Sequence, residues 1–498
     1  MTHFTAEQWT TRSLSLQFRT NAFIEGAFVP ARSGATFASV NPATGKTLAE
    51  VASCDAYDID AAVRSARRAF DEGTWSRAGA AQRQAVLKRL NALIVEHAEE
   101  LALLDSLDMG KLVRESFTVD VPGTAALFNW YAEAIDKIGD EVAPSEPGNL
   151  ALITRAPLGV VGAVVPWNYP LEMAAWKLAP ALVVGNSVVL KPAEQSSLSA
   201  LFLAELASEA GLPDGVLNVV PGLGHVAGKA LGLHDDVDCI AFTGSTKVGK
   251  FFLEYAGQSN MKQVWLECGG KSPNVIFADA DLDEAAAKAC FSIFYNQGEV
   301  CSANSRLLVE ASIKDELLDR IVAAAADYRP GNPLDPASGM GAMVSAEHLN
   351  RVMKFIERAR TDATLIIGGE PVMTETGGAF LPPTVFDVVD PNSQLAVEEV
   401  FGPVLAVTTF EDEDEALSLA NGTRYGLAAS VWTNDLSRAH RVANRLRAGT
   451  VSVNTVDALS FQTPFGGFGQ SGFGRDLSLH AIDKYVGLKT TWISYKNG

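Results

Sequence analysis

Residues 159–167 read Gly-Val-Val-Gly-Ala-Val-Val-Pro-Trp, a short apolar run typical of a parallel strand buried on both faces. A helical pattern follows over 171–184, and Ser-Val-Val-Leu at 187–190 predicts a second buried strand. Such β-α-β-α alternation is characteristic of an α/β protein with a doubly wound parallel sheet. The alternation continues with helix, strand, helix and strand candidates at 198–210, 216–220, 224–232 and 239–243.

A second segment of the same character runs from about Pro273 to Ser471 and predicts a second α/β domain. Its strand candidates are 274–277, 305–309, 404–410 and 428–433. Its helix candidates are 285–296, 314–328, 349–360 and 436–446.

The composition narrows the class of protein. Of the 498 residues 47% are hydrophobic, as expected for several domains with large cores. Acidic residues outnumber basic ones by 59 to 40, and the net charge of −19 disfavours nucleic acid as a partner. We find no signal peptide and no apolar run of the ~18–20 residues that a membrane span needs. The five cysteines include no CxxC pair, which argues against disulfides and a metal site and favours a cytoplasmic location.

Two glycine-rich segments each lie between a predicted strand and the start of a predicted helix, as phosphate-binding turns do. The glycines of 222–228 depart from GxGxxG spacing, so an ordinary glycine turn explains them as well. The segment 244–250 fits GxxxxGK, but Phe251 stands where a P-loop needs Ser or Thr, which excludes a P-loop. The Gly244-Ser245 turn then suits either a phosphate or a simple helix cap.

Lys191 and Glu194 directly follow the strand at 187–190, where ligands of doubly wound sheets bind. A carboxylate in this place can accept hydrogen bonds from ribose hydroxyls and would repel a 2′-phosphate. A solvated charge pair on a loop is the alternative, which the spacing alone favours.

Three residues suggest catalysis. Cys301 lies in the polar, glycine-containing stretch NQGEVCS, which favours a reactive thiolate over a buried small hydrophobe. Glu267 precedes two glycines and predicts a general base, with Cys268 as a rival nucleophile; a tight turn is the alternative. Asn168 is held between the prolines of PWNYP, so its amide can stabilise an oxyanion, or else satisfy its own loop.

Ten motifs occur in this order: PWNYP, WKLAP, KPAE, GLPDGVLNVVPG, FTGSTKVG, ECGGKSP, NQGEVCS, EEVFGPV, YGLAASVWT and PFGGFGQSGFGRD. Together they resemble the NAD(P)-dependent aldehyde dehydrogenase superfamily, over about Ile24 to Ile493. WYAEAIDKI, SNMKQVWLE, NQGEVCSA and DLSRAHR look most like the bacterial gamma-glutamyl-gamma-aminobutyraldehyde and guanidinobutyraldehyde dehydrogenases. The resemblance implies NAD-dependent oxidation of an aldehyde to a carboxylic acid.

The resemblance also implies a three-part α/β fold. A Rossmann-like, doubly wound cofactor domain is expected at 1–133 and 152–266, and an α/β catalytic domain at 267–474. A small β-arm for oligomerisation is expected at 134–151 and 484–498. Members of the family form dimers or tetramers, so the expected state is a homo-oligomer, and we favour a homotetramer.

The catalytic roles are likewise implied by the resemblance. Cys301 matches the nucleophile, which attacks the aldehyde carbon and forms a thiohemiacetal. The Asn168 amide and the Cys301 backbone N–H hold the oxyanion while hydride passes to the nicotinamide. Glu267 matches the general base, which activates water to hydrolyse the thioester.

For the cofactor, the resemblance implies NAD, with NADP less favoured because of Glu194. Glu399 is expected at the nicotinamide ribose, Ser245 at the diphosphate and His348 at a cofactor ribose. Lys191 is expected with Glu194 at the adenosine ribose. The cofactor residues that the resemblance implies are Trp167, Lys191, Glu194, Gly224, Gly244, Ser245, His348, Glu399 and Phe401.

Two positions depart from the family pattern. Asp476 stands in Gly-Arg-Asp where the family often has Glu, and the shorter side chain puts a role in ordering the hydrolytic water in doubt. Glu172 follows PWNYP, where the family usually has apolar residues along the aldehyde tunnel. Lys177, in WKLAP, matches a family lysine near Asn168, and its role stays open.

An acidic group that faces an apolar tunnel is costly unless it is paired, so Glu172 predicts a substrate with an amino or guanidino group. A Glu172 that turns outward or pairs with a protein cation is an alternative of equal weight. Asp120 and Asp457 are weaker candidates for the same task. The expected apolar and cation–π walls are Met173, Trp176, Phe461 and Phe465.

Other functions stay possible from the sequence. The main one is the same chemistry on neutral aliphatic or aromatic aldehydes, against which Glu172 argues. A CoA-acylating enzyme is disfavoured by Glu267, which suits water as the acceptor. A catalytically silent homologue is disfavoured because Cys301, Glu267 and Asn168 occur together.

Overall fold

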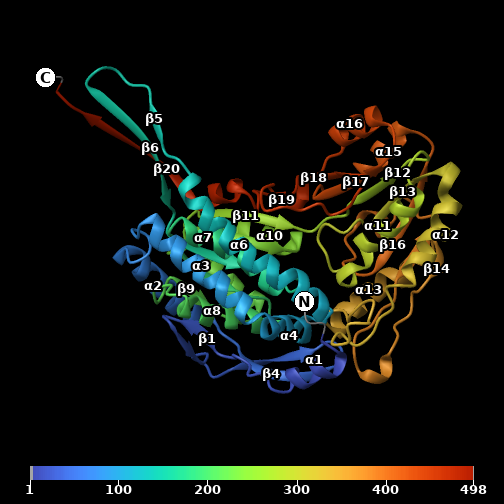
Figure 1. Ribbon diagram of the computed structural model, residues 1–498, viewed down its shortest axis with the longest axis horizontal. Coiled ribbons are helices and arrows are strands. Elements are labelled where there is room, and N and C mark those ends of the chain that lie inside the picture. Colours follow the sequence, from blue (N-terminus) through green and yellow to red (C-terminus); the bar gives the residue numbers. More distant parts are fainter. Residues whose placement is uncertain (1–3, 497–498) are drawn as a thin grey trace.

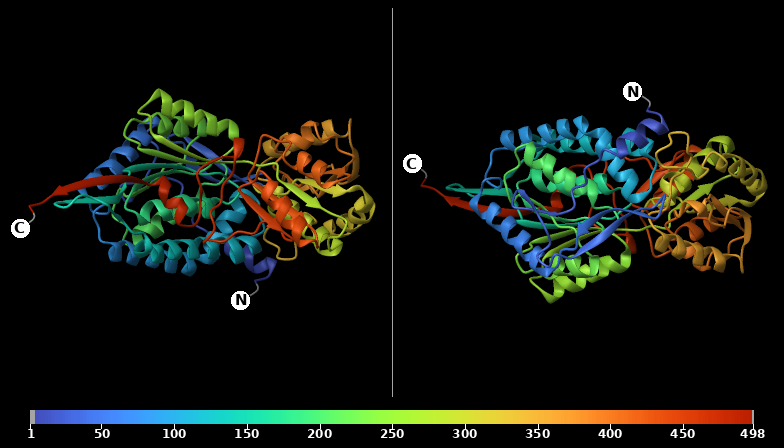
Figure 2. Two further views of the ribbon diagram at one scale, coloured as in Figure 1. Left: turned by 90° about the horizontal axis from the view of Figure 1, so that it is seen from above. Right: turned by 90° about the horizontal axis from the view of Figure 1, so that it is seen from below.

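The computed structural model describes residues 4–496 and shows two α/β bodies, with a thin arm projecting from the first (Figure 1). Residues 1–3 and 497–498, the ends of the predicted cofactor domain and arm, lie outside the described residues. Figure 2 shows that the arm points away from the second body.

The first body is built on a sheet with the strand order β19-β11-β10-β7-β8-β9-β1-β2. Its five central strands are parallel: β7 (Val160–Val164), β8 (Ser187–Lys191), β9 (Leu217–Val219), β10 (Cys239–Gly244) and β11 (Gln263–Cys268). The order runs outward from β7 in both directions, which confirms the predicted doubly wound sheet and places a switch point between β7 and β10. Antiparallel strands complete its edges: β1 (Ala22–Ile24), β2 (Ala27–Val29) and β19 (Gly472–Phe473).

Side chains of β7 alternate between two hydrophobic cores, as a strand covered on both faces requires. Val161 and Ala163 pack into one core, and Val160 and Val164 into the other. The first core is covered by α3 (Ala80–Glu96), α4 (Ala98–Met109), α6 (Val121–Ala134), α7 (Pro170–Val183) and α8 (Leu198–Glu209). The second is covered by α2 (Ala56–Glu72), α9 (Lys229–Leu233) and α10 (Thr246–Gln258). Before α2 lie α1 (Ala6–Ser13) and the paired strands β3 (Thr36–Asn41) and β4 (Lys46–Ala52).

The second body is a seven-stranded sheet with the order β14-β15-β16-β13-β12-β17-β18. All neighbours are parallel except β14 and β15. The strands are β12 (Pro273–Ile276), β13 (Arg306–Glu310), β14 (Thr364–Ile367), β15 (Thr384–Asp387), β16 (Val404–Phe410), β17 (Ala428–Trp432) and β18 (Thr450–Val453). The main helices are α11 (Leu282–Phe294), α12 (Lys314–Ala325), α13 (Ala346–Ala359), α15 (Glu413–Ala420) and α16 (Leu436–Arg445).

The arm is an antiparallel sheet of β5 (Glu141–Ala143), β6 (Asn149–Pro157) and β20 (Val486–Ser494). Strand β6 therefore continues beyond the arm boundary expected at 151. The boundary expected at 267 falls inside β11, so Glu267 belongs to the sheet of the first body. Among the described residues, no helix is long and apolar enough to cross a membrane.

Candidate active site

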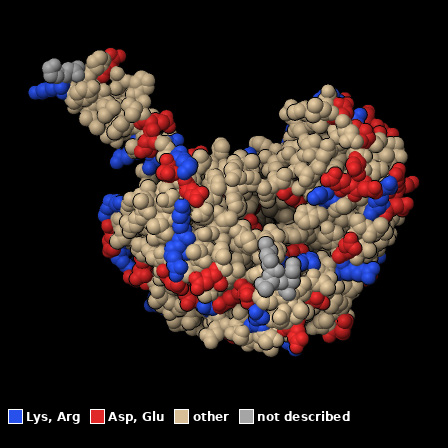
Figure 3. Space-filling model, viewed as in Figure 1, with Lys and Arg blue, Asp and Glu red and all other residues tan. Residues whose placement is uncertain are grey.

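A cavity of about 460 Å³ lies between the two bodies, at the carboxyl ends of the parallel strands of the first sheet. Figure 3 shows the molecule hollowed at this place. Its walls combine residues of the β7–α7 loop, of β10 and β11, and of the segment after α11. This is where a doubly wound sheet is expected to bind its ligand.

Cys301 reaches the cavity from a sharply bent segment of the second body. Asn296, Gln297 and Gly298 have φ angles of 47°, 58° and 69°, three consecutive left-handed residues that reverse the chain after α11. A Cβ at Gly298 would lie 2.3 Å from the Gly402 carbonyl oxygen, so only glycine fits there. Of the five cysteines, Cys301 alone is partly exposed, whereas the predicted rival Cys268 is buried.

Glu267 lies near the end of β11, where it pairs with Gly472 of β19, and it lines the cavity together with Cys301. Burial raises the pKa of Glu267 to about 8, and the charge of Lys177 partly offsets this effect. Burial and the Glu267 charge raise the pKa of Cys301 well above its ordinary value.

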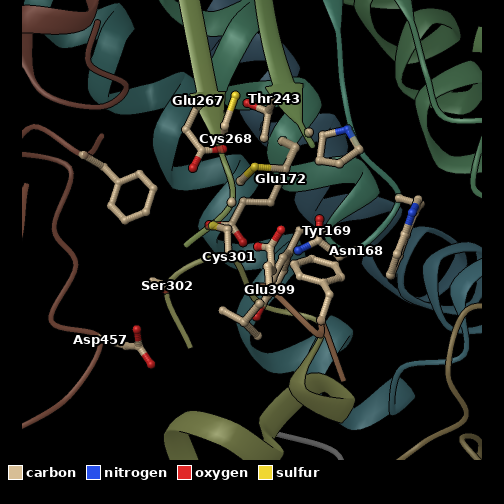
Figure 4. Close-up of a pocket in the computed structure, with 18 of the residues that line it drawn as sticks. Asn168, Tyr169, Glu172, Thr243, Glu267, Cys268, Cys301, Ser302, Glu399 and Asp457 are labelled. Atoms are coloured by element: carbon tan, nitrogen blue, oxygen red, sulfur yellow. The ribbon is translucent and has the colours of Figure 1, made fainter. Parts of the chain in front are cut away.

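Asn168 follows β7 and points toward Cys301 (Figure 4). The Nδ2 atom of Asn168 donates to the backbone carbonyl of Glu299 at 2.7 Å. The backbone carbonyl of Asn168 accepts from Asn296 Nδ2 at 3.0 Å. The amide carries two hydrogens, and the second is free for the cavity. The sequence signal, an asparagine between two prolines, thus corresponds to a fixed donor beside the thiol.

Residues of the predicted cofactor site surround one side of this cavity and the loops next to it. Lys191 Nζ pairs with Glu194 at 2.9 Å, and the Gly224 N–H lies 3.5 Å from the same carboxylate. Ser245 caps α10, while Gly244 and Trp167 line the cavity. The exposed N-terminus of α10 favours an anion such as a diphosphate.

Glu399 and Phe401 line the cavity from the loop before β16. Glu399 accepts from the Gly270 N–H at 3.1 Å, and burial raises its pKa to about 7. Phe401 has a left-handed φ of 60° and packs edge-on against Trp167 at 5.2 Å between ring centroids. His348 does not line the cavity, because its Nε2 contacts the Phe401 carbonyl at 2.6 Å from behind the wall. The His348 ring packs against Trp167 and Phe401, and its contact with a cofactor ribose stays a prediction.

The predicted substrate residues divide into two groups. Glu172, Met173, Trp176, Asp457 and Phe465 line the cavity, and Asp457 lies across Cys301 from Asn168 (Figure 4). The rings of Trp176 and Phe465 meet edge-to-face at 5.3 Å.

Asp120 and Phe461 are not on the wall, contrary to expectation. Asp120 is completely buried in an ion pair with Lys111, whose Nζ lies 4.0 Å from the Tyr169 ring centroid. Lys111 carries no signal in the sequence, because its spacing of nine residues from Asp120 is not one at which local ion pairs form.

Lys177, whose role the sequence left open, pairs with Asp476 at 2.5 Å rather than with Asn168. Lys484, which the sequence analysis missed, binds the other carboxylate oxygen of Asp476. Within residues 4–496, no group of three or more His, Cys, Asp or Glu is placed to hold a metal ion.

Comparison with known proteins gives a consistent result. Residues 28–491 match the family described as "Aldehyde dehydrogenase family". The chain is 52% identical to the NADP/NAD-dependent aldehyde dehydrogenase PuuC of Escherichia coli K12, and 51% identical to an aminoacetaldehyde dehydrogenase of Pseudomonas aeruginosa. Each alignment covers 98% of both chains.

A solved structure of the indole-3-acetaldehyde dehydrogenase AldA of P. syringae, in complex with NAD+ and IAA, superposes with a TM-score of 0.98. It is 55% identical, and the match covers 99% of this chain and 100% of that one. The chain therefore belongs to the aldehyde dehydrogenase family and is an enzyme that oxidises aldehydes to carboxylic acids.

Proposed function

We propose that this enzyme oxidises a cationic ω-amino or guanidino aldehyde with NAD. The observation that carries the proposal is the Glu172 carboxylate on the cavity wall. Two relatives differ in substrate charge, since one is an aminoacetaldehyde dehydrogenase and the other an indole-3-acetaldehyde dehydrogenase. The local charge balance supports the first kind of substrate.

The wall behind Glu172 contains more acids than bases. Burial raises the pKa of Glu172 to about 8, and the Asp120 charge adds to this effect. Lys111 is the nearest cation, but it is paired with Asp120. One oxygen each of Asp120 and Glu115 is buried without a hydrogen bond. A cationic substrate tail beside Glu172 would stabilise the ionised form of its carboxyl group, and the Trp176 ring offers a cation–π face.

The catalytic residues support the thioester mechanism. The Cys301 thiol loses its proton to solvent, and the thiolate attacks the aldehyde carbon to give a thiohemiacetal. The second N–H of Asn168 and the Cys301 backbone N–H stabilise its oxyanion. Bound NAD supplies the acceptor for the hydride that leaves the substrate carbon. Glu267 then removes a proton from the water that hydrolyses the thioester, releasing the acid and the Cys301 thiol.

The residues present fit NAD. Glu194 and Lys191, beside Gly224, would hold the adenosine ribose, and Ser245 at the start of α10 would contact the diphosphate. Glu399 would hold the nicotinamide ribose beside Phe401. The Glu194 carboxylate would repel a 2′-phosphate, so NADP is the poorer cofactor.

Neutral aldehydes are the second candidate. Trp176, Phe291, Tyr295 and Phe465 make much of the cavity aromatic, which would also suit a flat apolar substrate. Because the pKa of Glu172 is about 8, its carboxyl group is largely protonated near pH 7 when no cation is bound, and a neutral wall suits this candidate.

The test compares kcat/KM for guanidinobutyraldehyde and aminobutyraldehyde with that for hexanal and indole-3-acetaldehyde. We expect the cationic aldehydes to be preferred by about tenfold or more, which corresponds to ~1.4 kcal/mol in transition-state binding. Glu172→Gln should abolish the preference, whereas Asp457→Asn, which removes an acid already bound by Ser292, should keep it. A preference for neutral aldehydes in the wild type would reject the cationic substrate and favour the second candidate.

We also propose a homo-oligomer, most simply a homotetramer, assembled through the arm. Val142, Leu488 and Trp492 are 69%, 68% and 65% exposed on the arm sheet, which suits a strand interface. Light scattering should give four chains per particle, and the double variant Leu488→Lys, Trp492→Lys should form only dimers or monomers.

We also propose a cytoplasmic location, which fits the five free cysteines. Cell fractionation would test this location.

A further inference from the structure

A buried cluster of three charges lies behind the cavity. Lys177 of α7 and Lys484 bind the two carboxylate oxygens of Asp476, and all three side chains are 5% exposed or less. Asp476 is fixed in turn through its backbone, which exchanges two hydrogen bonds with Phe465 at 2.7 and 2.8 Å. Because charges this deep are costly unless paired, one carboxylate shared by two lysines leaves one positive charge in excess.

The excess charge lies next to the candidate general base. Glu267 pairs with Gly472 of β19, and the chain reaches Asp476 four residues later. The charge of Lys177 stabilises the Glu267 carboxylate, whereas the charges of Asp476 and Glu399 oppose its ionisation. A second lysine on Asp476 therefore cancels that opposition and leaves Lys177 effective toward Glu267.

We propose that Lys484 is a positioning residue for thioester hydrolysis, which holds Asp476 so that Lys177 keeps Glu267 available as a base. The proposal rests on the role proposed above for Glu267. It also gives a role to the short Asp476, whose carboxylate is held between the two lysines.

The remaining groups around the cluster are neutral or opposed to ionisation of Glu267. Around Glu267 they are Cys268, Cys301 and Glu399, and around Asp476 and Lys484 they are Tyr131, Cys239 and Tyr485. Burial raises the pKa values of Tyr131 and Tyr485, so neither supplies charge near neutral pH. The two lysines are thus the cations that set the balance.

The experiment is a double-mutant cycle of Lys484 and Asp476. It measures how the steady-state rate after the first NADH burst depends on pH. With both lysines charged, the cluster has a net charge of +1, which becomes 0 in Lys484→Met and +2 in Asp476→Asn. The pH of half-maximal hydrolysis should rise by about 1 unit in the first and fall in the second. In the double variant the net charge returns to +1, so the midpoint should return close to the wild-type value.

The burst itself should change little in all three variants, because aldehyde attack and hydride loss precede hydrolysis. Lys262→Met is the matched control, since it removes another buried lysine, one that donates to the Gly232 carbonyl at 2.9 Å in the first body. Lys484→Arg should restore the wild-type midpoint.

A midpoint unchanged in Lys484→Met and in Asp476→Asn, with only a lower melting temperature, would reduce Lys484 to a structural role and overturn the proposal. If Lys484→Met does not fold, the downward shift in Asp476→Asn decides alone. The variant Glu267→Gln tests the general-base role separately from the role of Lys484. It should retain the NADH burst and lose steady-state turnover. Normal turnover by Glu267→Gln would refute the general-base assignment itself.

Discussion

Asn168 Nδ2 lies 2.7 Å from the carbonyl oxygen of Glu299, two residues before Cys301. This bond ties the loop after β7 in the first body to the nucleophile segment of the second. The donor and the thiol are therefore set relative to each other before a substrate binds, as electrostatic stabilisation of an oxyanion requires.

The first prediction concerns this donor. Asn168→Ala should slow the NADH burst by about 10²–10³-fold, because the oxyanion loses a side-chain donor. Rapid mixing with excess NAD and aldehyde measures the burst. Asn274→Ala, at another buried asparagine, in β12, is a control for folding and should leave the burst rate within a few fold. A normal burst in Asn168→Ala would place the oxyanion elsewhere.

The second prediction separates the two cysteines on the cavity wall. Cys301→Ala should abolish NADH formation while NAD binding is retained, because the thiohemiacetal cannot form. Cys268→Ala should stay active, since residue Cys268 is only 2% exposed, whereas Cys301 is partly exposed. NADH absorbance measures activity and tryptophan fluorescence measures NAD binding. Activity in Cys301→Ala together with its loss in Cys268→Ala would exchange the two assignments.

Much of the fold was predictable because its central strands are buried and apolar on both faces. The strand expected at 404–410 is β16 exactly as predicted, and the helix expected at 198–210 is α8 shortened by one residue. The helix expected near 224–232 begins instead as a π-helical turn at Gly224–Gly228 before α9. The strands β14, β15 and β18 of the second sheet were missed, because each is only four residues long.

The site was predictable where one short motif supplies both the residue and its loop, as for Asn168 and Cys301. It was not predictable where the contact joins distant segments. Lys177 and Asp476 are 299 residues apart, and no local pattern reports their ion pair. His348 was assigned to the cofactor by resemblance, but only the fold shows that its ring contacts the Phe401 carbonyl.

The third prediction concerns cofactor choice. Glu194→Gln should raise the affinity for NADP by about tenfold, because the repulsion of a 2′-phosphate is removed while the side-chain volume stays the same. NAD should bind more weakly, since the amide is a poorer acceptor for two ribose hydroxyls. KM values for both cofactors with a fixed aldehyde measure the change. Glu205→Gln, a surface acid that pairs with Arg19, is the control and should leave both values unchanged. An unchanged ratio of the two KM values in Glu194→Gln would remove Glu194 from the ribose site.

The last prediction uses the pKa of Glu172, which burial raises to about 8. The Glu172 carboxyl group is therefore mostly neutral below pH 8 and mostly ionised above it. A cationic substrate tail should bind better as the pH rises from 6.5 to 9. Butylguanidine, a competitive inhibitor that stays charged throughout this range, reports binding without the catalytic steps. Its Ki against hexanal should fall by about tenfold between these limits, because the guanidinium gains an ionised partner.

In Glu172→Gln the same Ki should be high at every pH, because the amide cannot ionise. Pentanol, which is neutral and of similar length, should give a Ki that does not vary with pH in either enzyme. Measuring Ki rather than kcat separates Glu172 from Glu267, whose pKa is also about 8. If the butylguanidine Ki is flat in the wild type, or falls equally in Glu172→Gln, the carboxylate does not face the substrate tail.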